Sequence, residues 1–400
     1  MTPFYQLDDL PTGGLAIHYR TLAHGLVSRG HDVSILFADR FGSKPQEPDH
    51  PGISFIPIQF KLPKIFHTPI IGRILRSLGL TEQIRFRNDS KLISQTLAGL
   101  ESEVSFDIIE SPNNGASLHQ YLNRINDQKC IIRIATTDKE HSLINLTTPS
   151  PYLYQLFREE GRSFRNCPNL VTHTHAHRDL ICREYDLPVE KFSIIPVSVR
   201  IPTDKEIIPT VQKEKTVVLF VGRFEKRKGI DVLFDIIAST LSQIKKIEFR
   251  LVGQDSNNEH QKAFEKKHPE LIPNIRFLGK IQTKALESEY KNCDIFIAPS
   301  RYESFGLIYA EAMSFAKPAI GTRIGGIPEV IKDRTTGILC ENENVDSYVQ
   351  AIVELTENPD LAMRIGQSAR KRVIERFDQE SLIRDTESYY REIQERFRRN

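Results

Sequence analysis

Two glutamates, Glu303 and Glu311, stand eight positions apart in the stretch "PSRYESFGLIYAEAMSFAKPAIGT". An apolar run typical of a buried strand precedes Glu303, and a helix is expected to begin near Phe305 or Gly306. The free N–H groups at the start of a helix favour an anion. A carboxylate at Glu311 could accept hydrogen bonds from both hydroxyls of a ribose. The stretch therefore predicts a nucleoside diphosphate site. The alternative is two unrelated acids, one complementing the helix dipole and one on the helix surface.

A second stretch, "VVLFVGRFEKRKGID" at residues 217–231, has the features of a phosphate-binding loop. Its apolar run is typical of a buried strand that ends at Gly222, and Arg223 and Lys228 flank the loop that follows. Gly229 allows a tight entry into the next helix. Cations beside a strand end and a helix start suit phosphate. The alternative is a solvated basic turn in which Arg223, Lys226, Arg227 and Lys228 all face water, so this loop alone leaves both interpretations open.

The composition is that of an ordinary soluble globular protein, with 39% hydrophobic and 26% charged residues. A length of 400 residues exceeds what one hydrophobic core usually fills, so we expect two domains. The net charge of +2 gives no general attraction to nucleic acid. The five cysteines include no C-x-x-C pair, so neither a disulfide framework nor a zinc site is expected. Without an apolar run of membrane-spanning length or a signal-peptide pattern, we expect a cytoplasmic protein.

Short apolar runs alternate with longer amphipathic stretches along the chain, which is typical of a doubly wound α/β fold. Most runs are continuously apolar, as expected for strands buried on both faces of a parallel sheet. We predict two Rossmann-like domains, residues 1–198 and 203–375, that face a cleft, and a C-terminal helix at 376–400 that could return toward the first domain. The expected strands are residues 31–38, 53–60, 106–111, 129–135, 169–174 and 192–199, then 216–222, 247–253, 274–279, 294–300, 318–322 and 337–340.

The span from Val217 to about Val345 resembles the donor domain of the retaining, GT-B-fold glycosyltransferases of glycosyltransferase family 4. The resemblance rests on G-R-x4-K-G from Gly222 to Gly229, "FLG", "APSRYESFGLIYAEAM" with its E-x7-E pair, "GTRIGGIPEVI" and "TGIL". Several motifs in the same order and spacing make it very specific. The first half is similar more loosely, through Gly13-Gly14 before a helix, "RGHDV", "FDIIE" and "YDLPVEKFSIIP". The resemblance therefore covers nearly the whole chain.

The resemblance implies a role for each matching residue. Arg223 and Lys228 would bind the diphosphate of the donor, Glu311 would hold its ribose, and Glu303 would contact the transferred sugar. Gly325 and Gly326 would leave backbone room beside this ligand, unless they form an ordinary turn. The implied catalytic residues are Glu303, Arg223 and Lys228. The implied donor-binding residues are Gly222, Arg223, Lys228, Glu303, Ser304, Phe305, Gly306, Leu307 and Glu311, and Gly13 and Gly14 form the acceptor or phosphate loop.

The implied function is a retaining glycosyltransferase that uses a UDP-, GDP- or ADP-linked sugar and a sugar, lipid-linked or small-molecule acceptor. Fixed cations and a helix start can stabilise the leaving diphosphate. Since the chain has no D-x-D motif, we expect no metal and no cofactor. The alternatives are a catalytically weak nucleotide-sugar-binding protein and an epimerase or phosphorylase of the same fold. An NAD-dependent oxidoreductase is disfavoured because neither half carries G-x-G-x-x-G after its first strand.

Two features depart from the family pattern. Only "MTPFYQLDDLPT" precedes Gly13, where an apolar strand is expected, so either Phe4 to Leu7 form a remnant or the true start lies upstream. Many relatives also place a histidine after the strand at 129–135, where this chain has Ala135. His141 follows six residues later and could replace that histidine, although an ordinary loop histidine is the alternative.

Two further patterns are weaker. His173, His175 and His177 alternate, but without a nearby carboxylate in the sequence this is a poor metal signature. Residues 60–80 mix basic and apolar side chains, so this segment could contact an anionic membrane surface or pack as an ordinary amphipathic helix.

Overall fold

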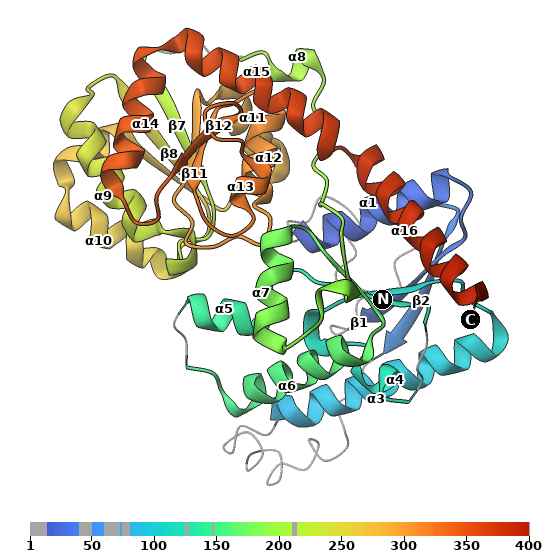
Figure 1. Ribbon diagram of the computed structural model, residues 1–400. Coiled ribbons are helices and arrows are strands. Elements are labelled where there is room, and N and C mark those ends of the chain that lie inside the picture. Colours follow the sequence, from blue (N-terminus) through green and yellow to red (C-terminus); the bar gives the residue numbers. More distant parts are fainter. Residues whose placement is uncertain are drawn as a thin grey trace. The chain divides into compact units, whose positions relative to one another are not determined.

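The computed structural model describes residues 14–39, 50–59, 73, 81–124, 128–145, 148–209 and 214–399. Gly13, Phe4 to Leu7 and all of the 60–80 segment except Arg73 lie outside these described residues, so the predictions made for them are not addressed. The chain divides into two compact units (Figure 1). The first comprises residues 1–195 together with 382–400, and the second comprises residues 196–381.

The second unit is built on one six-stranded parallel sheet, as its continuously apolar strands predict. Helices pack against this sheet on its two faces (Figure 1). The strands are β7 (Thr216–Val221), β8 (Ile247–Val252), β9 (Ile275–Gly279), β10 (Ile295–Ala298), β11 (Ala319–Thr322) and β12 (Gly337–Cys340). The α-helices are α8 (Asp204–Ile207), α9 (Ile230–Gln243), α10 (Glu259–Lys267), α11 (Thr283–Asn292), α12 (Leu307–Ser314), α13 (Ile327–Val330), α14 (Val345–Glu357) and α15 (Pro359–Arg376).

The strand order of this sheet, β12-β11-β10-β7-β8-β9, contains a topological switch point. From β7 the chain adds β8 and β9 on one side, and it then returns to add β10, β11 and β12 on the other. The loops that follow β7 and β10 therefore leave neighbouring strands in different directions. In open α/β sheets this is where ligands bind, at the carboxyl ends of the two strands.

The first unit has two parallel sheets within its described residues, a pair β1-β2 and a four-stranded sheet β3-β4-β5-β6. The predicted strands are all found, although β6 is shorter than expected because it ends before Pro196. The strands are β1 (Val33–Asp39), β2 (Ile53–Gln59), β3 (Ile109–Pro112), β4 (Cys130–Arg133), β5 (Asn169–Thr172) and β6 (Phe192–Ile194). The helices are α1 (Gly14–Ser28), α3 (Thr81–Glu103), α4 (His119–Leu122), α5 (Asp138–Ile144), α6 (Pro151–Asn166) and α7 (His175–Tyr185).

The last helix, α16 (Gln379–Arg399), contributes apolar side chains to the core of the first unit. Its buried Leu382, Tyr389 and Ile393 cluster with buried residues of the four-stranded sheet. None of the helices in the described ranges is long and apolar enough to cross a membrane.

Candidate functional site

Two loops meet at the switch point of the second sheet. The loop after β7 contains a 3-10 turn at Lys226–Lys228 and ends at Gly229, which precedes α9 with φ of 68°. A side chain at Gly229 would place its Cβ 2.0 Å from the carbonyl oxygen of Pro299, which directly follows β10. Glycine is therefore required here both by the backbone conformation and by the close approach of the second loop.

Glu303, in the loop after β10, lies at the centre of a buried ion cluster and is only 7% exposed. Its Oε1 is 2.5 Å from Nζ of Lys228 and accepts a hydrogen bond of 2.9 Å from Ser300 Oγ. Its Oε2 accepts a hydrogen bond of 3.1 Å from Nη1 of Arg227. Arg227 also donates a hydrogen bond to the carbonyl oxygen of Tyr302. The two loops are therefore joined both by this bond and by the contacts of the Glu303 carboxylate with Lys228 and Arg227.

This cluster keeps Glu303 ionised. Burial alone would raise the pKa of Glu303, but the charges of Lys228 and Arg227 outweigh burial and hold that pKa below its ordinary value. The pKa of Lys228 is lowered, because burial of its ammonium group outweighs the attraction of Glu303. Two desolvated cations thus meet at the Glu303 carboxylate, and Arg227 is also paired with Glu225 at 3.1 Å.

Glu311 lies in α12 and has a different environment. Its Oε2 accepts a hydrogen bond of 2.7 Å from the hydroxyl group of Tyr290. The pKa of Glu311 is raised because burial outweighs both this hydrogen bond and the charge of Lys228. The Glu311 carboxylate is therefore close enough to Lys228 for that charge to affect its pKa, and the hydrogen bond from Tyr290 fixes its orientation.

The remaining predicted donor-binding residues surround this cluster in different ways. Gly222 continues from β7, and its N–H donates to the carbonyl oxygen of Val252. Phe305 is buried against Phe377, so only its backbone is left for a ligand. Gly306 precedes α12 with φ of 98°, a conformation that favours glycine, while Ser304 and Leu307 on either side are partly buried.

Arg223 does not join the cluster around Glu303. Its side chain is 55% exposed and pairs with Glu225 at 3.2 Å. The structure places Arg227 there instead, although the sequence marked Arg227 only as part of a basic turn. Four cations follow one another closely in this loop, so residue type cannot distinguish those that point inward.

The glycine pair after β11 also contacts the Glu303 loop. The N–H of Gly326 donates to the carbonyl oxygen of Glu303 at 2.9 Å. A Cβ at Gly325, where φ is 55°, would lie 2.6 Å from that same oxygen. These glycines hold the backbone of the Glu303 loop. The sequence had suggested either backbone room beside a ligand or an ordinary turn at Gly325 and Gly326, and it had not predicted this contact.

Several candidates belong to the first unit. Ala135 follows β4, and its N–H donates to Oδ1 of Asn113 at 2.9 Å. His141 lies on α5 within hydrogen-bond distance of Asn145. Gly14, in the predicted acceptor loop, is the exposed first residue of α1.

The alternating histidines have separate environments. His173 is buried, and its Nδ1 lies 3.3 Å from the carbonyl oxygen of Ile195. His177 is also buried and contacts Thr172 and Glu140, whereas His175 begins α7. Among the residues that the structure describes, no three His, Cys, Asp or Glu side chains gather as metal ligands would.

Comparison with known proteins identifies both halves of the chain. Residues 12–201 match the family described as "Glycosyltransferase Family 4", and residues 203–372 match "Glycosyl transferases group 1". An uncharacterized 41.2 kDa protein from the cps region of Klebsiella pneumoniae is 36% identical over 140 residues, which are 35% of this chain and 37% of that protein. The alignments with this relative and two further curated ones span less than half of each relative's length.

Solved structures share the two-unit arrangement of parallel sheets. Sucrose-phosphate synthase from Thermosynechococcus elongatus superposes with a TM-score of 0.72 at 20% identity, covering 96% of this chain and 94% of that one. The Anabaena protein HepE in complex with UDP-glucose superposes with a TM-score of 0.65 at 15% identity, covering 96% and 98%. The fold is therefore the GT-B fold.

Proposed function

The chain belongs to glycosyltransferase family 4, and on this basis we propose that it transfers a sugar from a nucleoside diphosphate sugar to a hydroxyl group of an acceptor. We propose further that the reaction retains the anomeric configuration and needs no metal ion. The proposed acceptor is a sugar, a lipid-linked sugar or a small molecule, as in the synthesis of a cell-surface polysaccharide or glycoconjugate. The observation that carries the proposal is the buried cluster of Arg227, Lys228 and Glu303 at the switch point.

The charge of this cluster supports an anionic ligand. Three cations of this loop, Arg223, Arg227 and Lys228, contact two carboxylates, Glu225 and Glu303, so the loop carries one excess positive charge. The backbone N–H groups at the start of α12 add further donors on the same side of the sheet. A diphosphate would compensate this charge, with Lys228 as its direct partner and exposed Arg223 as a second one at the edge.

The two carboxylates suit the two uncharged parts of such a donor. Glu311, oriented by Tyr290, can accept hydrogen bonds from both ribose hydroxyls. Glu303, kept ionised by its cations, would face the transferred sugar and stabilise the positive charge that develops on it. Lys228 would at the same time stabilise the negative charge that develops on the leaving diphosphate. Fixed charges would thus do the work for which other enzymes use a metal ion.

The first donor to test is UDP-glucose, because HepE is similar in fold and its structure contains that compound. We would measure release of the free nucleoside diphosphate from UDP-, GDP- and ADP-sugars. The variants are Lys228→Ala and Glu311→Gln, and the matched control is Lys226→Ala, because Lys226 lies in the same 3-10 turn but is exposed.

The expected result is release from one class of donor, with a loss on the order of a hundredfold in Lys228→Ala and wild-type release in the control. Saturable binding of a donor without release, even when candidate acceptors are added, would instead support a nucleotide-sugar-binding protein. If the folded wild type neither binds nor consumes any donor, the proposed site is wrong. Product stereochemistry and the effect of a chelator would test retention and independence of metal.

A further inference from the structure

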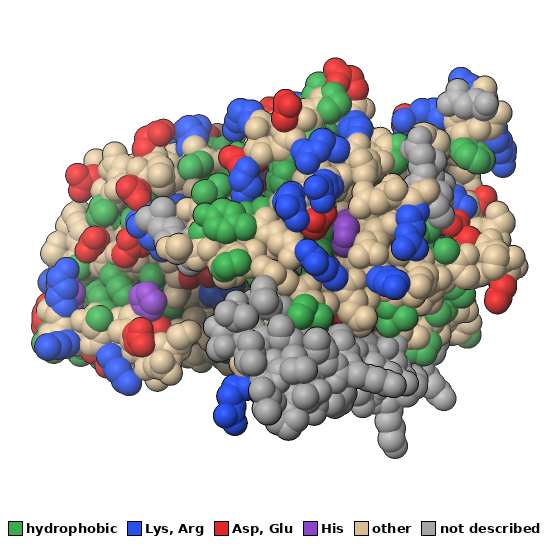
Figure 2. All heavy atoms as spheres, turned by 90° about the horizontal axis from the view of Figure 1, so that it is seen from below, with side chains coloured by type: hydrophobic (Ala, Val, Ile, Leu, Met, Phe, Trp, Pro, Cys, Tyr) green, Lys and Arg blue, Asp and Glu red, His purple; other side chains and the backbone are tan. Residues whose placement is uncertain are grey.

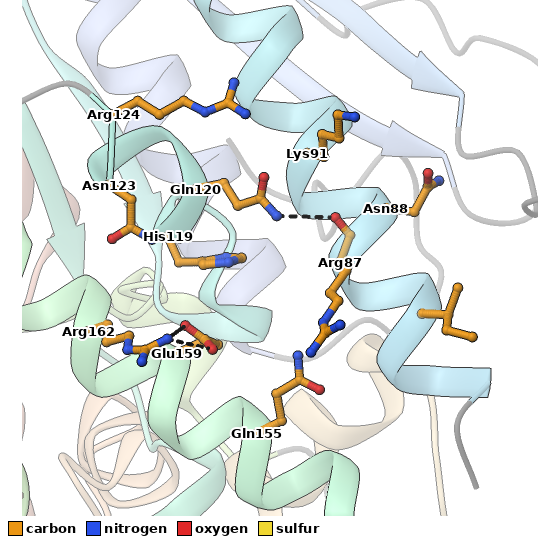
Figure 3. Close-up of a pocket in the computed structure, with 11 residues that line it drawn as sticks. Arg87, Asn88, Lys91, His119, Gln120, Asn123, Arg124, Gln155, Glu159 and Arg162 are labelled. Atoms are coloured by element: carbon orange, nitrogen blue, oxygen red, sulfur yellow. Dashed lines mark hydrogen bonds and ion pairs between the residues drawn. The ribbon is translucent and has the colours of Figure 1, made fainter. Parts of the chain in front are cut away.

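A second cavity lies in the first unit, where helices α3, α4 and α6 meet (Figure 3). Its volume is about 600 Å³, which is within the usual range for small-molecule sites. None of the residues proposed to bind the donor lines it, because all of those belong to the second unit. The donor site proposed above therefore gives this cavity no role.

Positive charge is concentrated around the cavity. Four cations line it, Arg87 and Lys91 from α3, Arg124 from the segment after α4, and Arg162 from α6. Lys and Arg side chains gather on this side of the molecule in the view of Figure 2. The spacing of four residues places Arg87 and Lys91 on one face of α3.

The acid in the cavity does not balance these cations. Glu159 is buried and already accepts hydrogen bonds from Arg158 and Arg162, the latter through both carboxylate oxygens at 3.1 Å. Within the described part of the chain, Arg87, Lys91 and Arg124 form no ion pair. Three unpaired cations thus line one cavity, and a bound anion would compensate part of their charge.

A buried histidine forms part of the wall between these cations. His119 is 6% exposed and stacks on Phe86 with 5.2 Å between ring centroids. Its Nδ1 lies 3.2 Å from the carbonyl oxygen of Ala116, so this nitrogen carries the proton. Burial lowers the pKa of His119 and favours the neutral ring. Nε2 is then an acceptor, and among the described residues it has no partner.

The rest of the lining is rich in amides rather than apolar side chains. Asn88, Gln120, Asn123 and Gln155 line the cavity, and Ile84 is the one apolar side chain among its described lining residues. Amides both donate and accept hydrogen bonds, as sugar hydroxyl groups do, and the free Nε2 of His119 can accept one more.

From the unpaired cations, the amides and the free nitrogen of His119, we propose that this cavity binds an anionic carbohydrate. The ligand carries a phosphate or carboxylate group, held by Arg87 at one end of the cavity or by Arg124 and Lys91 at the other (Figure 3), and hydroxyl groups that contact the amides and His119. Arginine suits either anion because its planar guanidinium can bind two oxygens at once. Both a sugar phosphate and an acidic oligosaccharide have this chemistry.

The test is calorimetric titration of the full chain with two probes, glucose 6-phosphate and tetragalacturonate, and with glucose and inorganic phosphate for comparison. The variant is Arg87→Gln/Arg124→Gln. Arg85→Gln is the matched control, because Arg85 lies on the same helix and pairs with Glu82 instead of lining the cavity. Lys228→Ala is included to detect binding at the proposed donor site.

At least one probe should bind, with affinity reduced on the order of tenfold or more in the double variant and unchanged in Arg85→Gln and Lys228→Ala. Which probe binds identifies phosphate or carboxylate as the anion. The proposal is overturned if neither probe binds to wild type at millimolar concentration, or if the double variant binds as well as wild type. Inorganic phosphate that binds as tightly as glucose 6-phosphate would refute the carbohydrate part. If only Lys228→Ala loses affinity for the probes, the binding belongs to the donor site.

Discussion

Glu303 carries a charge in a buried position because two cations share its carboxylate. Removing one partner of such a group leaves uncompensated buried charge, whereas an exposed ion pair contributes little. Arg227 and Arg223 offer this contrast within a single loop, since the Arg227 side chain is 8% exposed and that of Arg223 is 55% exposed. Both also contact Glu225.

We expect Arg227→Gln to lower the free energy of unfolding of the protein by about 3 kcal/mol, because Glu303 and the carbonyl of Tyr302 lose a charged donor. Arg223→Gln should change it by less than about 0.5 kcal/mol. Urea unfolding followed by circular dichroism measures both. Equal effects of the two variants would mean that Arg227 is not part of a buried ion cluster in solution.

At the scale of elements, the site depends on how closely the loop before α9 approaches the end of β10. Gly229 and Gly279 have nearly equal φ, 68° and 63°, so an alanine would be strained at either position. Only at Gly229 would the added Cβ also collide with a neighbour, the carbonyl oxygen of Pro299. Nothing lies within 4 Å of a Cβ at Gly279.

The comparison of Gly229→Ala with Gly279→Ala therefore separates backbone strain from loop packing. Gly279→Ala should cost about 1 kcal/mol of unfolding free energy, and Gly229→Ala at least about 3 kcal/mol, since overpacking adds to strain. Gly229→Ala should also weaken donor binding, because Lys228 is the adjacent residue. A Gly229→Ala variant as stable as Gly279→Ala would contradict the observed contact between the two loops.

At the scale of the whole molecule, the pH dependence of stability depends on buried groups in the first unit as well as on the site. Glu160 lies on α6, and burial raises its pKa to about 8, aided by the charges of Asp138 and Glu140. Its carboxyl group accepts hydrogen bonds from Asn113 at 2.9 Å and from Tyr185 at 2.8 Å. Asn113 in turn holds the N–H of Ala135, so Glu160 supports the loop after β4.

Between pH 4.5 and about 8 the folded chain keeps the Glu160 proton that the unfolded chain has lost, so the contribution of Glu160 to the free energy of unfolding falls as pH rises. The slope expected from this group approaches 1.4 kcal/mol per pH unit and vanishes above about pH 8. In Glu160→Gln this contribution to the slope should be absent, because glutamine is neutral at every pH and can still accept a hydrogen bond from Asn113. Urea unfolding across this pH range tests it, with the exposed Glu103→Gln as control. An unchanged slope in Glu160→Gln would show that another group causes it.

The alternation of apolar runs and amphipathic stretches determined the α/β class, the parallel sheets and the places where strands end. These properties are readable from sequence because burial on both faces demands continuous apolar runs. The ordered motifs likewise led to the family and to Lys228, Glu303 and Glu311 as site candidates. Helices α3 to α7 were not individually predicted; α4 and α5 span only four and seven residues, which is less than the length over which helical periodicity can be recognised.

The tertiary structure decided what each charged side chain contacts. The order of strands β7 and β10 brings two loops about 75 positions apart in sequence into contact, and only this contact makes Arg227 rather than Arg223 a partner of Glu303. The second cavity has the same origin, since its cations come from α3, from α6 and from the segment after α4, which no sequence motif connects. A residue's type limits the chemistry that it can perform, but its pKa and its partners depend on burial and distance, which the packing of distant segments sets.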